Sequence, residues 1–189
     1  ASKVITLNIN DLNDPPAISS AATGSIAENA AISTIAYAAA ASDPDTGDTI
    51  TFSLAGTDAS FFDIDSDDGE IRLKTAANFE VKNSYSVDIL ATDSGSSPAS
   101  ASKTVTINIT DQNDSPVAID DSAITTLNTA KNNIVALDDD TDEDSDTLNI
   151  QSIAYSGAGT VSHNGTTINY SPPTGVPTLT ETITLSLIH

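Results

Sequence analysis

The chain of 189 residues has no cysteine, no methionine and no tryptophan, and aromatic residues make up only 4% of it. Without cysteine there is no disulfide framework, so a small extracellular fold built from this sequence needs another means of bracing itself. Two histidines and no cysteine also fail to supply a Ser-His-Asp or Cys-His catalytic set. No run of about 18 apolar residues is present, so the sequence predicts no membrane-spanning helix.

Positive charge is scarce as well. Lysine and arginine together number 6 against 27 aspartates and glutamates, which gives a net charge of -21. Such a chain is not expected to bind nucleic acid or an anionic membrane. The hydrophobic fraction of 38% and the regular alternation of apolar residues favour a folded β-protein over a disordered acidic one.

A polar phrase occurs twice in the chain, about one hundred residues apart. "DLNDPPAI" covers residues 11–18, and "DQNDSPVAI" begins at residue 111. Each follows an alternating apolar run, "ITLNIND" in the first copy and "VTINITD" in the second, and "ASK" precedes both runs. Alternation at period two predicts a half-buried strand, so the repeated phrase marks the junction of a tandem repeat.

Short alternating runs separated by glycine, aspartate, asparagine and serine predict strands almost throughout. Before the second junction we expect strands at 3–10, 25–27, 32–37, 49–54, 61–64, 70–74, 84–91 and 102–110. After Pro116 we expect them at 124–127, 133–136, 147–153, 159–162, 166–170 and 182–188. The run "AYAAAAS" (36–42) lacks helix caps and leads into a turn, so we do not expect a helix there. The pattern predicts an all-β protein of tandem Greek-key β-sandwiches.

The acidic residues form recurring clusters at strand ends. "DPDTGD" (43–48) in the first unit is followed by "DTDEDSD" (140–146) in the second. Several like charges at loop tips are unfavourable unless a cation neutralises them. Oxygen ligands without cysteine or a placed histidine select a hard cation, and a high ligand number favours Ca²⁺ over Mg²⁺. An EF-hand loop is excluded, because the glycine and final glutamate at its spacing are missing.

Six motifs in order resemble the cadherin repeat in its bacterial form. They are "IAEN" (26–29), "ASDPDTGDTITFSL", "FFDIDSDDGEIRL", "NFE" (78–80), "YSVDILATDSG" and "DQNDSP". The later segments "NNIVALDDDTDEDSDTLNI" and "GTVSHNGTTINYSPPTG" look like cadherin-like tandem repeats of large bacterial surface proteins. The resemblance implies cadherin/immunoglobulin-like sandwiches in three parts: the last strand and linker of a preceding repeat (1–14), a cadherin repeat (15–114) and a repeat lacking its final strand (115–189).

The resemblance also implies Ca²⁺ at each junction, with ligands from both repeats and the linker. For the second junction these are Glu28, Glu80, Asp111, Asn113, Asp114, Asp140 and Asp142, with carbonyls of Gln112, Ser115 and a residue near Asp146. For the first they are Asn13, Asp43, Asp45 and Asp93, with carbonyls of Pro15 and Asp48; Asp11 and Asp14 would serve ions shared with a preceding repeat. Two departures stand out. Asn78 replaces the usual aspartate, and no aspartate follows the last strand as a counterpart of Asp93.

The function expected from this set is that of a non-enzymatic, calcium-stiffened module of an extracellular, bacterial-surface adhesin or large secreted protein, whose parent protein is membrane-associated. Its partners would be neighbouring repeats, other adhesin molecules or surface polysaccharide. The alternative is a calcium-dependent carbohydrate-binding module of a secreted polysaccharide-processing protein, for which Tyr37, Tyr155 and Tyr170 are the only loose candidates. His163 lies in a hairpin-turn signal and is expected to be a surface residue, and a glycosidase pair of Glu28 and Glu80 explains the linker less well than metal does.

The two ends of the chain suggest a further interaction. Ile5, Leu7 and Ile9 would form one apolar face of a strand whose own repeat is missing. A sandwich without its last strand leaves an open edge that recruits another strand. The sequence therefore suggests a strand-exchange dimer, in which residues 3–10 of one molecule add to residues 115–189 of another.

Overall fold

The computed structural model describes residues 2–10, 12–126, 128–175 and 179–189. The chain divides into two compact units, Ala1–Gln112 (unit 1) and Asn113–His189 (unit 2). The division falls inside the repeated linker phrase. Within the described residues, no helix has the length and apolar character needed to cross a membrane.

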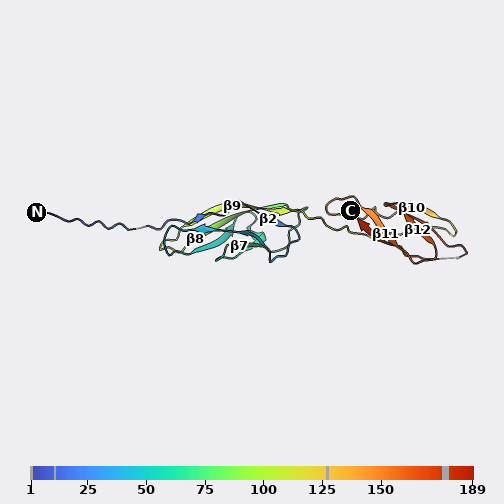
Figure 1. The fold of residues 1–189 in the computed structure, drawn as a ribbon, viewed down its shortest axis with the longest axis horizontal. Coiled ribbons are helices and arrows are strands. Elements are labelled where there is room, and N and C mark those ends of the chain that lie inside the picture. The colour runs from blue at the N-terminus through green and yellow to red at the C-terminus, as the bar shows by residue number, and fades with distance from the viewer. Residues whose placement is uncertain (1, 11, 127, 176–178) are drawn as a thin grey trace. The chain divides into compact units, whose positions relative to one another are not determined.

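Unit 1 is built from two facing sheets (Figure 1). The first has the order β2-β9-β8-β5 and the second the order β3-β7-β6. Their strands are β2 (Thr23–Ala27), β3 (Ile35–Ala38), β5 (Ile50–Ala55), β6 (Phe62–Ile64), β7 (Glu70–Leu73), β8 (Ser84–Asp93) and β9 (Ser100–Thr110), joined by a short pair, β1 (Ala17–Ile18) with β4 (Ala41–Ser42), and by one 3₁₀ turn, η1 (Ala59–Phe61). The strand β2 pairs with β9 in parallel, while the other ladders of unit 1 are antiparallel.

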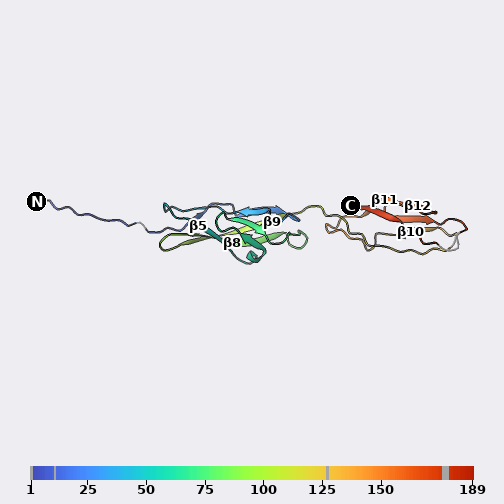
Figure 2. The same cartoon turned by 90° about the horizontal axis from the view of Figure 1, so that it is seen from below.

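The core of unit 1 follows from period-two alternation in its two longest strands. Val87 and Ile89 of β8 and Val105 and Ile107 of β9 have no exposed surface, and neither has Ile71 of β7 in the opposite sheet. Alternate residues of a strand point to opposite faces, so these side chains fill the space between the two sheets. Figure 2 shows the same strands after a quarter turn.

Unit 2 has two smaller sheets, of order β10-β13-β12 and β11-β14. Their strands are β10 (Lys131–Val135), β11 (Asn149–Ala154), β12 (Thr160–His163), β13 (Thr167–Ser171) and β14 (Thr184–Ile188). Among the residues of unit 2 that the structure describes, the buried apolar cluster consists of Ala136, Ile150 and Ile168. A groove of about 690 Å³ opens beside that cluster, lined in part by Ile124 and Leu185. The hydrophobic core of unit 2 is therefore small.

The predicted all-β fold is confirmed, and "AYAAAAS" contributes to β3 and β4 rather than to a helix. The strand predicted at 3–10 is wrong. Residues 3–10 have no ladder partner among the described residues, and Ile5, Leu7 and Ile9 expose 74%, 83% and 93% of their surface. The strand predicted at 124–127 is wrong for 124–126, and Leu127 lies outside the described residues. An alternating run forms a strand only where a neighbouring edge offers hydrogen-bond partners, which both segments lack here.

Candidate metal centre

One acidic cluster of unit 1 lies in the loop between β4 and β5. Carboxylate oxygens of Asp43, Asp45 and Asp48 all lie within 4.8 Å of one another. The backbone N–H of Asp45 donates to Oδ1 of Asp43 at 2.8 Å, which folds the loop back on itself. Gly47 has a φ of 105°, a left-handed conformation that suits glycine, and it allows the chain to turn before Asp48.

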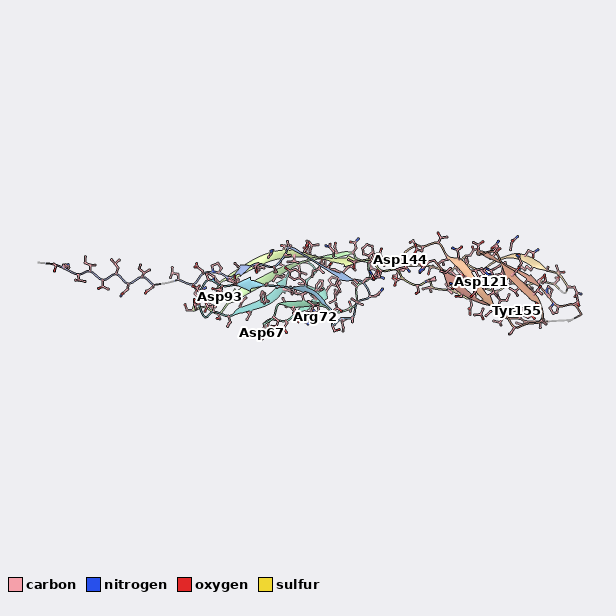
Figure 3. All side chains as sticks on the ribbon, in the orientation of Figure 1. Asp67, Arg72, Asp93, Asp121, Asp144 and Tyr155 are labelled. Carbon is pink, nitrogen blue, oxygen red and sulfur yellow. The ribbon has the colours of Figure 1, made fainter. Side chains whose placement is uncertain are left out.

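The first linker closes over this loop. The side-chain amide of Asn13 donates to Oδ2 of Asp93 at 3.0 Å. The N–H of Asp14 donates to Oδ2 of Asp45 at 2.7 Å. Asp93 ends β8 (Figure 3), exposes only 4% of its surface and accepts further hydrogen bonds from the N–H groups of Gly95 and Ala99. The structure thus brings together the predicted residues Asn13, Asp43, Asp45, Asp48 and Asp93, which we call the first cluster, and places Asp14 beside it; Pro15 is exposed and Asp11 lies outside the described residues.

The carboxylates of the first cluster differ in how well their surroundings stabilise the negative charge. Burial would raise the pKa of Asp93, but the hydrogen bonds from Asn13, Gly95 and Ala99 outweigh it and hold that pKa below its usual range. For Asp48, burial and the neighbouring charges of Asp43, Asp93 and Asp45 outweigh a hydrogen bond from Ser94 and raise its pKa. In addition, Oδ2 of Asp43 is buried with no hydrogen-bond partner among the described residues. An orphaned buried oxygen within an all-oxygen set fits a hard cation such as Ca²⁺.

A second group, which we call the Glu28 cluster, lies where β2 and β9 end. Glu28 exposes 2% of its surface, and its two carboxylate oxygens accept the N–H groups of Phe79 and Gln112, each at 2.8 Å. These two hydrogen bonds lower the pKa of Glu28 despite its burial, and the side chains of Glu80 and Asp111 interact with the same carboxylate. Three predicted carboxylates therefore meet within unit 1.

The two clusters of unit 1 lie at opposite ends of β9. Asp93 accepts the N–H of Ala99, the residue before β9, and Glu28 accepts that of Gln112, just after it. An eleven-residue strand is about 35 Å long, so roughly that distance separates the clusters. Asn78, which replaces the usual aspartate, is used locally: its Oδ1 accepts the N–H of Val81 at 2.8 Å.

Unit 2 repeats the pattern of the first cluster. The N–H of Asp114 donates to Oδ2 of Asp144 at 2.5 Å, as that of Asp14 does to Asp45. The N–H of Asp144 donates to Oδ1 of Asp142 at 3.1 Å, as that of Asp45 does to Asp43. Figure 3 labels Asp144, which the sequence analysis did not select.

The remaining predicted residues of unit 2 divide between this loop and its surroundings. Asp146 belongs to the loop and donates its N–H to Oδ1 of Asp142 at 3.3 Å. Asp140 lies outside the repeated pattern, because its Oδ1 accepts the N–H of Ile119 at 2.8 Å. Asn113 is placed like Asn13, with its amide 2.6 Å from Nε2 of His189, and Ser115 is exposed.

The tyrosines do not form a flat stacking platform. Tyr37 is buried and donates its hydroxyl to the carbonyl of Ala21. The hydroxyls of Tyr155 and Tyr170 both donate to Oε2 of Glu181, and the two rings meet edge to face, 6.4 Å apart. Such interactions typically stabilise the fold and do not leave a flat ring face free to stack on a sugar.

The comparison with known families covers nearly all of the chain. Residues 22–110 match the model of the cadherin domain, and residues 113–187 match that of the bacterial Ig domain. Over these residues the chain resembles a cadherin domain followed by a bacterial Ig domain. Cadherin domains are calcium-binding extracellular modules of adhesion proteins, not enzymes.

Curated relatives match about half of the chain. Protocadherin Fat 4 of Mus musculus is 36% identical over 104 residues, which cover 54% of this chain and 2% of that protein. Protocadherin-19 of Danio rerio is 30% identical over 106 residues, or 53% of this chain and 10% of that protein. The chain thus spans a small part of these relatives.

Solved structures show the same fold. Human Protocadherin-24 EC1-2 (Form II) has a TM-score of 0.62 at 21% identity, covering 93% of this chain and 85% of that chain. Human CDH23 EC21-23 has a TM-score of 0.58 at 26% identity, covering 88% and 57%. Both support two β-sandwich domains in sequence.

Proposed function

We propose that this chain is a calcium-binding module of an extracellular bacterial adhesin or large secreted surface protein, whose parent protein is membrane-associated. Calcium at the junctions between repeats would hold successive domains in line. The observation that carries the proposal is the unpartnered buried Oδ2 of Asp43 within the oxygen-only first cluster. The bacterial Ig domain match to residues 113–187 supports a bacterial source.

The mechanism is electrostatic. Without metal, the carboxylates of each cluster repel one another, as the raised pKa of Asp48 reflects. A bound Ca²⁺ removes this repulsion and links residues of the domain to residues of the linker. Extracellular modules bind Ca²⁺ with Kd values on the order of 10⁻⁴–10⁻³ M. At ten times Kd each ion adds about 1.4 kcal/mol, so a few ions decide whether a junction is ordered.

For the second junction we propose a calcium site that uses Glu28, Glu80 and Asp111 from unit 1, together with the linker. Small-angle scattering tests it: the particle is expected to be longer and stiffer in Ca²⁺ than in chelator. Glu80→Ala or Asp111→Ala should give the chelator profile in the presence of Ca²⁺. Asp63→Ala, at an exposed position outside the clusters, removes the same charge and should keep the calcium response. A profile that Ca²⁺ leaves unchanged contradicts the proposal.

Self-association by strand addition is a second part of the proposal. The apolar side chains of Ile5, Leu7 and Ile9 are exposed, and unit 2 presents a groove beside a thin core. Residues 3–10 of one copy could supply a strand to residues 115–189 of another.

A calcium-dependent carbohydrate-binding module remains the competing function, and no described contact favours it over adhesion. A glycan array screened with and without Ca²⁺ separates the two. Calcium-dependent glycan binding that survives Tyr155→Phe and Tyr170→Phe would require a surface other than these tyrosines.

A further inference from the structure

The histidine at position 189 takes the place in unit 2 that an aspartate has in unit 1. The amide of Asn13 contacts Asp93, and the amide of the equivalent Asn113 contacts His189. Asp93 ends β8, and His189 directly follows β14. Two further hydrogen bonds are shared by the two loops, from Asp14 to Asp45 as from Asp114 to Asp144, and from Asp45 to Asp43 as from Asp144 to Asp142. At the position of Asp93, unit 2 therefore offers the nitrogen of His189 in place of a carboxylate oxygen.

The side chains around His189 already converge. Ligand atoms of Asp142, Asp146 and His189 all lie within 4.8 Å of one another. Asp142 has 1% of its side chain exposed; its Oδ1 accepts two backbone N–H groups, which leaves Oδ2 directed at Nδ1 of His189, 2.9 Å away. His189 itself exposes 18% of its side chain, so the imidazole is held inside the loop rather than in solvent.

The donor set determines which ion fits. Calcium takes oxygen ligands almost exclusively, whereas Zn²⁺ and related dications bind imidazole nitrogen together with carboxylate oxygen and often keep a water. Nδ1 of His189 and Oδ2 of Asp142 lie 2.9 Å apart, so a single such ion could bind both atoms. Asn113 contacts the other ring nitrogen, and a partner there fixes the orientation of a metal-binding histidine.

We propose that Asp142, Asp146 and His189 form a binding site for a transition-metal dication of the Zn²⁺ type. The site shares no residue with the Glu28 cluster or the first cluster, neither of which contains a histidine. It reassigns Asp142 and Asp146 from the calcium set that the resemblance implies for the second junction. His189 follows β14 and the loop 142–146 precedes β11, and these two strands pair with each other. The ion would therefore fasten the two strands at the end where Asn149 pairs with Ile188.

Calorimetric titration of the full chain with Zn²⁺, in a buffer containing saturating Ca²⁺, tests the proposal. We expect one zinc ion to bind despite the calcium and to raise the melting temperature of unit 2. His189→Ala should weaken zinc binding by at least about tenfold, because the loss of a ligand should cost no less than the loss of a group that orients one. His163→Ala removes the other histidine of the chain, and it should leave zinc binding unchanged. Equal zinc affinity in the wild type and in His189→Ala overturns the proposal.

A second variant tests the proposal without relying on the folding of His189→Ala. His189→Asp restores the oxygen of unit 1, so it should lose the preference for Zn²⁺ and gain Ca²⁺ binding at this loop. Melting curves in chelator show whether each variant is folded. Glu80→Ala separates the two proposals, because it should abolish the calcium response in scattering and leave the zinc titration as in the wild type. Retained zinc preference in His189→Asp contradicts the assignment of His189 as a ligand.

Discussion

Glu28 binds Gln112 across the end of unit 1: Oε1 of the carboxylate accepts the N–H of the linker residue at 2.8 Å. The same carboxylate holds Phe79 through Oε2, so one buried side chain fixes both the linker and the segment before Glu80. A carboxylate in this position has to stay ionised, because its protonated form is the poorer acceptor.

This arrangement predicts an acid-sensitive unit 1. The hydrogen bonds from Phe79 and Gln112 lower the pKa of Glu28 below its ordinary value of 4.5. A group whose pKa is lowered on folding contributes stability above its unfolded pKa, and that contribution is lost as the pH falls through the folded pKa. Urea unfolding in chelator should therefore show stability falling below pH 4.5, and the fall should be shallower in Glu28→Gln. Asp63→Asn, an exposed change of the same kind, should keep the wild-type slope; if Glu28→Gln keeps it too, the carboxylate does not hold the linker.

We predict that calcium binding at the first cluster depends on Gly95, although glycine has no side chain that could bind metal. A Cβ at this position would lie 1.5 Å from Oδ1 of Asn13 and 2.9 Å from Oδ2 of Asp48. Gly95→Ala should displace Asn13 from Asp93 and weaken calcium binding at the first cluster, measured by titration, roughly tenfold, as loss of a metal-orienting contact does. Ser97→Ala in the same exposed loop is the matched control. Unchanged affinity in Gly95→Ala would show that Asn13 does not shape the site.

We predict that unit 2 does not tolerate a larger side chain at position 159. A Cβ there would come within 2.6 Å of the carbonyl oxygen of Ser171 and 2.8 Å of the ring of Tyr170. Because the backbone of β13 cannot easily move, Gly159→Ala should destabilise unit 2 by about 1–3 kcal/mol, the usual cost of overpacking. Thermal unfolding followed by tyrosine fluorescence measures the change, and Ser156→Ala, at an exposed position, should have no effect. A wild-type melting temperature in Gly159→Ala would mean that this contact relaxes freely.

Deletion of residues 1–9 tests strand exchange. If residues 3–10 of one molecule complete unit 2 of another, the shortened chain should have a lower mass in solution and a lower melting temperature for unit 2. Light scattering and calorimetry measure the two quantities. A chain in which Ile5, Leu7 and Ile9 are all changed to serine keeps its length and should behave like the deletion. The same mass and the same melting temperature as the full chain would show that the strand is not donated.

Period-two alternation was sufficient to predict the sandwich of unit 1, because its long strands bury one face and expose the other. The alternating run at 3–10 is equally regular, yet a strand also requires an edge to pair with, and sequence alone does not show that edge.

The hydrogen-bonding register of the acidic loop of unit 2 is harder to predict from the sequence. Aspartates stand at 138, 140, 142, 144 and 146, so the two-residue spacing of Asp43 and Asp45 fits several registers. The hydrogen bonds from Asp114 to Asp144 and from Asp144 to Asp142 fix which register the fold uses. The sequence separation of the paired aspartates indicates the same register, because Asp14 and Asp45 are 31 residues apart and Asp114 and Asp144 are 30 apart.

The parallel pairing of β2 with β9 determines how unit 1 responds to tension. Thr23 pairs with Thr106 and Ala27 with Thr110, so the chain arrives at one end of the ladder and departs at the other. Opposite pulls on the two sides of the domain slide these strands lengthwise past each other. The bonds between them then bear the load together instead of parting one at a time, so a domain with this pairing is expected to withstand larger stretching forces than one whose terminal strands peel apart.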